Sequence, residues 1–157
     1  ALCSKYLDEI VTVDDDEIAQ AILFLMERGK MVAEGAGAAP VAAIMNRKFD
    51  VSGKVAAVIS GGNIDVTMIS RIIEKGLLRA GRMTKLRILM QDRPGQLEMA
   101  SRIIAAEGAN VMVVHHDRTD VDLDIRDAIL EITMETQDRE HAQRVINALR
   151  ANGFKVS

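Results

Sequence analysis

The sequence predicts an α/β segment over residues 1–81, followed by a small α+β domain over residues 82–157. In the first part, a continuous apolar run at 54–59 has the character of a parallel strand that is covered on both faces. In the second part, alternating segments at 84–90 and 128–135 are typical of half-buried strands, and a helical pattern follows each of them. With 48% hydrophobic residues, the chain can form real cores.

Composition excludes several classes of protein. The net charge of −3 and the pI of about 5.6 give no reason to expect nucleic acid or an anionic membrane as a partner. The sequence has no 18-residue apolar run, so we expect no membrane-spanning helix. The single cysteine, Cys3, cannot form an internal disulfide and fits a reducing compartment, which predicts a cytoplasmic protein. The first residue, Ala1, suggests a processed or truncated chain.

The chain opens with a predicted strand and helix. Residues 9–13 are short and β-branched, and the apolar residues between 18 and 26 recur at helical spacing. Asp14 to Asp16 supply a helix cap and early negative charge, and Gly29 is a plausible stop. The aspartate triplet could instead bind a metal, but successive residues point in different directions, so we predict no metal site.

Small residues and a glycine turn follow. The segment 32–40 fails as a dinucleotide fingerprint, because a third glycine is absent and a helix precedes it. Its Glu34 is either a surface residue or part of a pocket. The apolar run at 54–59 leads directly into Ser60, Gly61 and Gly62, at the carboxyl end of a strand, where α/β sheets bind ligands. Two strands cannot bury a parallel sheet, so we expect the rest of that sheet outside this chain, and residues 1–80 either poorly packed or covered by self-association.

The second part is organised around the turn at 91–97. A strand precedes this turn and a helix follows it. Asp92 is a good capping residue, Pro94 fits a first helical turn, and Gly95 permits close approach to the backbone. The sequence therefore predicts a tight strand-to-helix turn whose free amide groups favour an anion.

The remaining elements complete a βαββαβ order. A strand at 110–116 places Val111, Val113 and His115 on one face, with the intervening residues on the other. After a polar loop and the strand at 128–135, Asp138 caps a helix that ends near Gly153, and a short strand closes the chain. This order predicts an antiparallel sheet with two helices on one face.

The residues present argue against three other functions: RNA binding, metal binding and catalysis within this chain. An RNA-recognition domain has the same order but needs exposed aromatic residues on its central strands, and these strands have none. His115, His116 and Asp117 could suggest a metal, but neighbouring strand residues face opposite ways. No Ser-His-Asp or Cys-His arrangement can be argued from spacing, so we predict no catalytic residues in this chain.

Two motifs carry a resemblance to known families. Glu-Gly-Ala-Gly-Ala at 34–38, followed by Ser-Gly-Gly-Asn at 60–63, resembles the end of the catalytic domain of threonine ammonia-lyases, which are pyridoxal-phosphate enzymes of fold type II. Asp-Arg-Pro-Gly-Gln-Leu at 92–97 resembles the opening of an ACT domain, a small-molecule sensor of ferredoxin-like fold. The ordered pair is similar to the shorter, ACT-bearing threonine dehydratases. No Ser-Phe-Lys-like lysine motif or phosphate loop is present, so the resemblance implies a C-terminal fragment.

The resemblance implies a reaction and a cofactor for the parent protein. That reaction is the conversion of threonine to 2-oxobutanoate and ammonia, with pyridoxal phosphate as the electron sink. Ser60 would face the pyridine nitrogen with a neutral hydroxyl, which suits elimination better than transamination. Gly61 and Gly62 would let the backbone approach the ring edge. Without the lysine, the resemblance implies an inactive fragment with no cofactor bound.

The resemblance also implies an effector site. Paired ACT domains would hold an amino acid, isoleucine or valine by metabolic logic, and would so form a homo-oligomer with allosteric control. The alternatives are a turn that is only a structural connection, and a stand-alone amino-acid-binding or oligomerisation module with no catalytic role. The implied effector contacts are Asp92, Gly95 and Gln96 from one copy and Asn110, Val111, Met112 and Val113 from its partner.

Overall fold

The computed structural model describes residues 3–50, 52–121 and 123–157, and these form two compact units. The first unit ends at Gly76 and the second begins at Leu77, so the break lies within helix α4 (Val66–Ala80). The sequence places its domain boundary a few residues further along, at 81/82, and that placement stays a prediction. No helix in the described ranges is long and apolar enough to cross a membrane.

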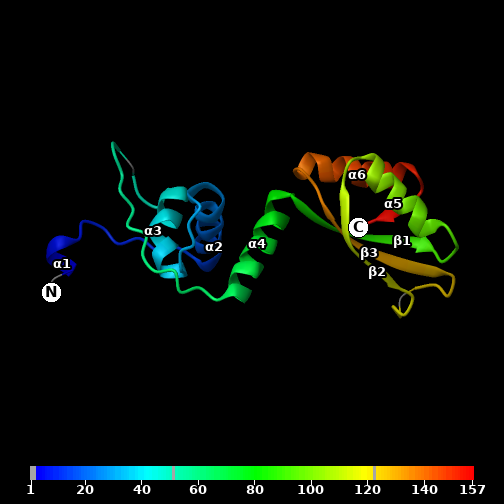
Figure 1. The fold of residues 1–157 in the computed structure, drawn as a ribbon, viewed down its shortest axis with the longest axis horizontal. Coiled ribbons are helices and arrows are strands. Elements are labelled where there is room, and N and C mark those ends of the chain that lie inside the picture. Colours follow the sequence, from blue (N-terminus) through cyan, green and yellow to red (C-terminus); the bar gives the residue numbers. More distant parts are fainter. Residues whose placement is uncertain (1–2, 51, 122) are drawn as a thin grey trace. The chain divides into compact units, whose positions relative to one another are not determined.

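The first unit is built from helices. Its elements are a short helix α1 (Cys3–Tyr6), α2 (Asp15–Phe24) with a π-helical extension η1 (Leu25–Gly29), α3 (Gly35–Met45) and most of α4 (Figure 1). Asp14 caps α2, as expected: its carboxylate accepts the Glu17 N–H at 2.8 Å, and the Glu17 carboxylate accepts the Asp14 N–H at 2.9 Å. This reciprocal pair satisfies two amide groups that a helix start would leave unbonded.

A small core holds these helices together. Helices α2 and α3 pack against each other, and one residue of α4 joins them. Alanines dominate this core, which lets the two helix backbones approach closely. The buried residues of this core are Ala21, Ile22, Leu25, Ala33, Ala38, Val41, Ala42 and Ile72.

The two strands predicted in the first unit are wrong. Residues 9–13 and 54–59 are irregular chain, and neither segment pairs with a strand in the described part of the protein. A strand requires a neighbour to accept its backbone hydrogen bonds, and neither segment has one here. Some of their apolar side chains are consequently exposed, with Ile10 at 77% and Val58 at 79%, while Val13, Ala57 and Ile59 pack partly against the helical core.

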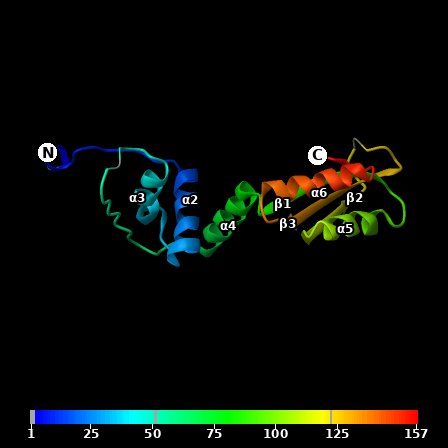
Figure 2. The ribbon, with the colours of Figure 1, turned by 90° about the horizontal axis from the view of Figure 1, so that it is seen from above.

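The second unit is a four-stranded antiparallel sheet with two helices on one face (Figures 1 and 2). The strand order is β2-β3-β1-β4, so β1 and β3 lie at the centre. The βαββαβ order predicted from the sequence is confirmed. Its elements are β1 (Met83–Gln91), α5 (Gln96–Ala106), β2 (Asn110–Asp117), β3 (Asp127–Glu135), α6 (Arg139–Ala151) and β4 (Lys155–Val156).

The core of this unit lies between the sheet and its two helices. Alternate residues of β1 and β3 point at the helices, because strand side chains alternate between faces. Asp138 caps α6 as predicted, since its carboxylate accepts the His141 N–H at 2.8 Å. The largest of the fully buried core side chains are Ile88, Ile104, Leu130, Ile132, Met134, Val145 and Leu149.

Strand β2 departs from strict alternation. Val111 pairs with Met134 and Val113 pairs with Thr133, so two steps on β2 match one step on β3. This is a β-bulge, and Met112 is the extra residue. After it Val114 and His116, and not Val113 and His115, share the helix-covered face with Val111, which corrects the facing predicted from the sequence.

Candidate functional site

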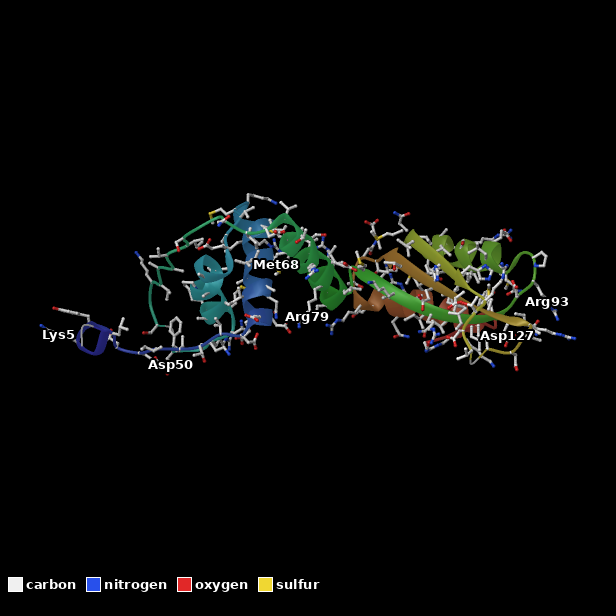
Figure 3. All side chains as sticks on the ribbon, turned by 90° about the horizontal axis from the view of Figure 1, so that it is seen from below. Lys5, Asp50, Met68, Arg79, Arg93 and Asp127 are labelled. Carbon is white, nitrogen blue, oxygen red and sulfur yellow. The ribbon has the colours of Figure 1, made fainter. Side chains whose placement is uncertain are left out.

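The turn between β1 and α5 is the first candidate site. Asp92 donates its N–H to the Arg126 carbonyl at 2.8 Å, so the turn lies beside the start of β3, and Figure 3 labels Arg93 and Asp127 at this end of the unit. Helix α5 begins only after Gly95, which adopts a left-handed φ of 89° that glycine tolerates best.

Asp92 does not cap α5, contrary to the prediction from the sequence. The helix-capping position is occupied by Gly95, which has no side chain to accept a hydrogen bond. Pro94 likewise precedes the helix instead of lying in its first turn. The N-terminal amide groups of α5 are therefore left without a side-chain cap, and such groups together with the helix dipole favour an anion.

The Asp92 carboxylate binds a cation from another strand. Arg118, just beyond the end of β2, donates Nε to Oδ2 at 2.8 Å and Nη2 to Oδ1 at 3.1 Å. His116 lies close to the same carboxylate, with Nε2 at 3.7 Å from Asp92 Oδ1. That Nε2 atom is buried and has no hydrogen-bond partner in the described structure. The three side chains form a polar cluster, which we call the turn cluster.

The turn cluster borders a hollow of about 410 Å³, within the size range of small-molecule sites. Sequence reasoning missed the contributions of His116 and Arg118. The strand directions could have indicated them: β1 and β2 both run antiparallel to β3, so the residues that follow β1 and β2 lie at the same end of the sheet. The residues that line the hollow are Met90, Asp92, Arg93, Pro94, Gly95, Leu97, His116 and Arg118.

The second candidate site is the glycine turn of the first unit. Glu34 donates its N–H to the Gly61 carbonyl at 3.1 Å, and its carboxylate lies where a side chain at position 61 would begin. A Cβ on Gly37 would lie 1.6 Å from the Ser60 carbonyl oxygen, so the start of α3 fits closely under this turn. Glu34 is therefore half-buried against the glycine turn, and its membership of a pocket stays a prediction.

The three residues of this turn are open to solvent. Ser60, Gly61 and Gly62 are all exposed, and the Ser60 hydroxyl has no hydrogen-bond partner among the described residues. A Cβ on Gly62 would meet only one atom, the Val32 carbonyl oxygen at 3.6 Å, so the approach to the turn is open. The turn thus offers a free hydroxyl at Ser60 and an open backbone at Gly62, whereas Glu34 covers Gly61.

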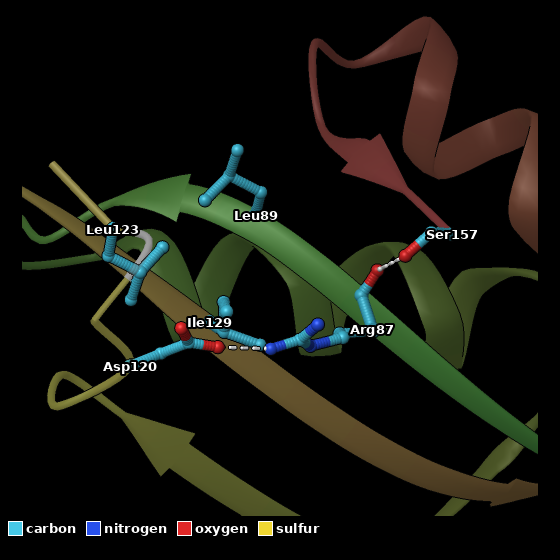
Figure 4. A pocket seen from close by; sticks show the side chains of 6 residues that line it. All are labelled: Arg87, Leu89, Asp120, Leu123, Ile129 and Ser157. Atoms are coloured by element: carbon cyan, nitrogen blue, oxygen red, sulfur yellow. Dashed lines mark hydrogen bonds and ion pairs between the residues drawn. The ribbon is translucent and has the colours of Figure 1, made fainter.

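The open face of the sheet carries a second hollow in the second unit, of about 220 Å³ (Figure 4). Arg87 crosses it to form an ion pair with Asp120, and its Nε lies 3.7 Å from a Glu131 carboxylate oxygen. An anionic ligand would have to compete with both carboxylates, so the turn hollow is the better candidate. The open-face hollow is lined by Arg87, Leu89, Asp120, Leu123, Ile129 and Ser157.

The described residues contain no cluster of side chains that could bind a metal ion. His115 pairs across from Glu131 on the open face, while His116 pairs across from Leu130 on the helix-covered face. The two rings therefore point to opposite sides of the sheet. Within the described ranges no three His, Cys, Asp or Glu side chains gather at one point.

Two aspartates outside these sites have perturbed acidity. The pKa of Asp65 is lowered chiefly by the Thr67 hydroxyl and then by the Thr67 N–H, both of which donate to its carboxylate. The pKa of Asp117 is lowered chiefly by the Thr119 N–H and then by the Thr119 hydroxyl, with smaller help from His115 and Arg87. The same Asp-x-Thr arrangement thus recurs once in each unit.

Comparison with known proteins matches each unit to a family. Residues 1–61 match the family described as pyridoxal-phosphate dependent enzyme, and residues 80–152 match the ACT domain. The chain joins part of a pyridoxal-phosphate-dependent enzyme domain to an ACT domain. The α+β expectation for the second part and the α/β origin of the first are thereby confirmed.

Two of the relatives reported below match both parts of the chain. The chain is 51% identical over 156 residues to the L-threonine ammonia-lyase of Thermotoga maritima, covering 99% of this chain and 39% of that protein. It is 46% identical over 151 residues to the L-threonine ammonia-lyase of Geobacter sulfurreducens, covering 96% of this chain and 38% of that protein. It is 48% identical over 75 residues to the catabolic L-threonine dehydratase TdcB of Staphylococcus aureus, covering 45% of this chain and 22% of that protein. The chain therefore spans well under half the length of these relatives.

The ACT domain separates the two halves of the predicted effector site within one chain. Asp92 and Gly95 line the turn hollow, whereas Gln96 does not. The segment Asn110–Val113 begins β2, where Asn110 donates its side-chain amide to Glu135 at 3.0 Å. That segment begins at the end of the sheet opposite the turn, so the two halves could meet only across two copies of the ACT domain. Their joint role in binding stays a prediction.

Proposed function

We propose that this chain is part of a pyridoxal-phosphate-dependent threonine ammonia-lyase, which converts threonine to 2-oxobutanoate and ammonia, and that its ACT domain senses an amino acid. The observation that carries the proposal is the 51% identity to an L-threonine ammonia-lyase along 99% of this chain. Both family matches lie within that alignment in the order expected from the two motifs. The turn hollow with its charged cluster supports the sensing role.

The glycine turn would hold the cofactor ring in this enzyme. Pyridoxal phosphate, when bound, supplies an electron sink for the removal of a proton next to the substrate amine. Ser60 would present its free hydroxyl to the pyridine nitrogen, which leaves the ring uncharged and favours elimination. Gly61 and Gly62 would allow the ring edge to lie against the backbone, and Glu34 would fix the turn through its bond to Gly61.

The ACT domain would regulate the enzyme through its effector. We propose an aliphatic amino acid, isoleucine or valine, held by Asp92, Gly95 and Gln96 of one copy and by Asn110–Val113 of a second copy. Binding would favour one arrangement of the paired domains and so bias the catalytic domains of a homo-oligomer. The product 2-oxobutanoate and this effector fit a cytoplasmic enzyme of isoleucine biosynthesis.

The complete protein that contains this chain provides the test. We expect it to release 2-oxobutanoate from threonine when loaded with pyridoxal phosphate, and its rate to change with isoleucine or valine. A version that lacks residues 82–157 should keep activity and lose that response. An equal response with and without the ACT domain would refute the sensing role, and no turnover of threonine would refute the enzyme and favour a binding or assembly module.

A further inference from the structure

In the turn cluster, Asp92 and Arg118 pair with each other as they could pair with the ammonium and carboxylate groups of an amino acid. Asp92 and Arg118 form a bidentate pair whose two members come from the ends of different strands. The pair lies on the border of the turn hollow, and its side chains are 33% and 60% exposed. Exposed ion pairs of this kind contribute little to stability, so a ligand can open the pair at little cost.

A zwitterion can exchange with both partners at once. Its carboxylate can take the two donors that Arg118 now gives to Asp92, and its ammonium group can take the carboxylate of Asp92. Every charge then keeps a partner. A ligand with only one charged group would satisfy one side chain of the pair and leave the other without its partner, so the exchange selects against it.

The unbonded nitrogen of His116 indicates that the cluster is incomplete. Buried polar atoms are nearly always hydrogen-bonded, and Nε2 of His116 has no such partner while lying 3.7 Å from the Asp92 carboxylate. Once Arg118 is released, a small movement of Asp92 toward His116 would bring its carboxylate within hydrogen-bond reach of this nitrogen. His116 is thereby a positioning residue that steadies Asp92 once Arg118 has been released.

We propose that Arg118 is the carboxylate-binding residue of the effector site, and that it exchanges Asp92 for the carboxylate of a zwitterionic α-amino acid while Asp92 takes the ammonium group. This proposal rests on the proposed sensing function and adds to it the residue that selects the ligand class. Arg144 on α6 is exposed and does not line the hollow, and its side chain makes no hydrogen bond or ion pair among the described residues, so it serves as a control.

Calorimetric titration of the 157-residue chain tests the exchange. The probes are isoleucine, valine, 3-methylpentanoate, which lacks the ammonium group, and 2-methylbutylamine, which lacks the carboxylate. We expect isoleucine or valine to bind, and each single-charge analogue to bind at least about tenfold more weakly, because one charge-assisted contact is lost. Failure of the unsubstituted chain to bind any amino acid would overturn both the sensing function and this inference.

Substitutions separate a failure of this inference from a failure of the sensing function. Arg118→Gln should weaken isoleucine binding by about tenfold or more and bring it within about threefold of 2-methylbutylamine, because the carboxylate has lost its partner. Arg118→Lys should fall between, since an ammonium lacks the planar fork. Arg144→Gln, which removes an equal charge away from the hollow, should leave isoleucine binding within about threefold of that of the original chain.

A structural role of Arg118 gives a different result. If Arg118 only holds the loop, Arg118→Gln will weaken isoleucine and 2-methylbutylamine equally, and isoleucine will keep its advantage. That outcome, or unchanged isoleucine binding, would overturn the inference while leaving the sensing function in place. Circular dichroism melts of each variant confirm that the comparison is made between folded proteins.

Discussion

The two units of the chain differ in whether their backbone hydrogen bonds are completed inside it. In the ACT domain four strands pair with one another and two helices cover one face, which buries Leu130 and Ile132 almost completely. In the first unit α2 and α3 enclose a small alanine-rich core, while residues 9–13 and 54–59 have no strand to pair with. The difference teaches that β-branched, apolar sequence is only half of a strand, and that a hydrogen-bonding neighbour is the other half.

Core truncation should reveal this difference most strongly. Ile132→Ala removes a side chain that is fully enclosed between sheet and helices, and we expect it to lower the free energy of unfolding by about 2–5 kcal/mol. Val58→Ala alters an exposed side chain of the first unit and should cost less than about 0.5 kcal/mol. Urea unfolding followed by circular dichroism measures both, and equal losses would contradict the contrast.

A close approach should make the glycine turn of the first unit sensitive to a single methyl group. Gly37→Ala would drive a Cβ into the Ser60 carbonyl, so we expect a cost of about 1–3 kcal/mol and displaced amide resonances at Ser60 and Gly61. Gly35→Ala, at the start of the same helix, meets Ile18 at an ordinary 3.7 Å and should be neutral or slightly stabilising. Matching spectra for the two variants would show that the turn is not packed as described.

The two Asp-x-Thr turns offer the smallest and finest comparison. A lowered pKa favours the charged carboxylate in the folded protein, so its contribution to stability is present above the unfolded value of about 3.9 and is lost as pH falls through the folded pKa. Thr67→Val removes the leading cause for Asp65, whereas Thr119→Val removes only the second cause for Asp117. NMR titration of the carboxyl carbons should therefore show the larger rise in the pKa of Asp65, and a larger rise for Asp117 would contradict this ranking.

Local pattern predicted the ACT domain well because its structure is completed within a short stretch of sequence. Alternation located β1 and β3, and Asp138 marked the start of α6. Alternation failed at Met112, where a bulge inserts one residue that no periodicity reveals. The capping role given to Asp92 failed for a different reason, since its partner Arg118 follows another strand and only the folded sheet brings the two together.

The first unit was harder to predict because its strands depend on neighbours that a local pattern cannot supply. Helix α2 was recoverable from spacing and from Asp14, since a helix makes its hydrogen bonds within itself. The Ser60 turn was found through its glycines, but its contact with Glu34 and Gly37 links residues that are more than twenty positions apart. Sequence spacing does not encode such packing.

Hydrogen exchange on the 157-residue chain tests most directly the claim that a self-contained ACT domain is joined to a segment whose strands lack partners. We expect slow exchange at the amides of β1 and β3, which are paired along their full lengths, and fast exchange over residues 9–13 and 54–59. Strong protection of residues 54–59 in a monomeric sample would contradict the account, because it would require hydrogen-bond partners that this structure does not provide.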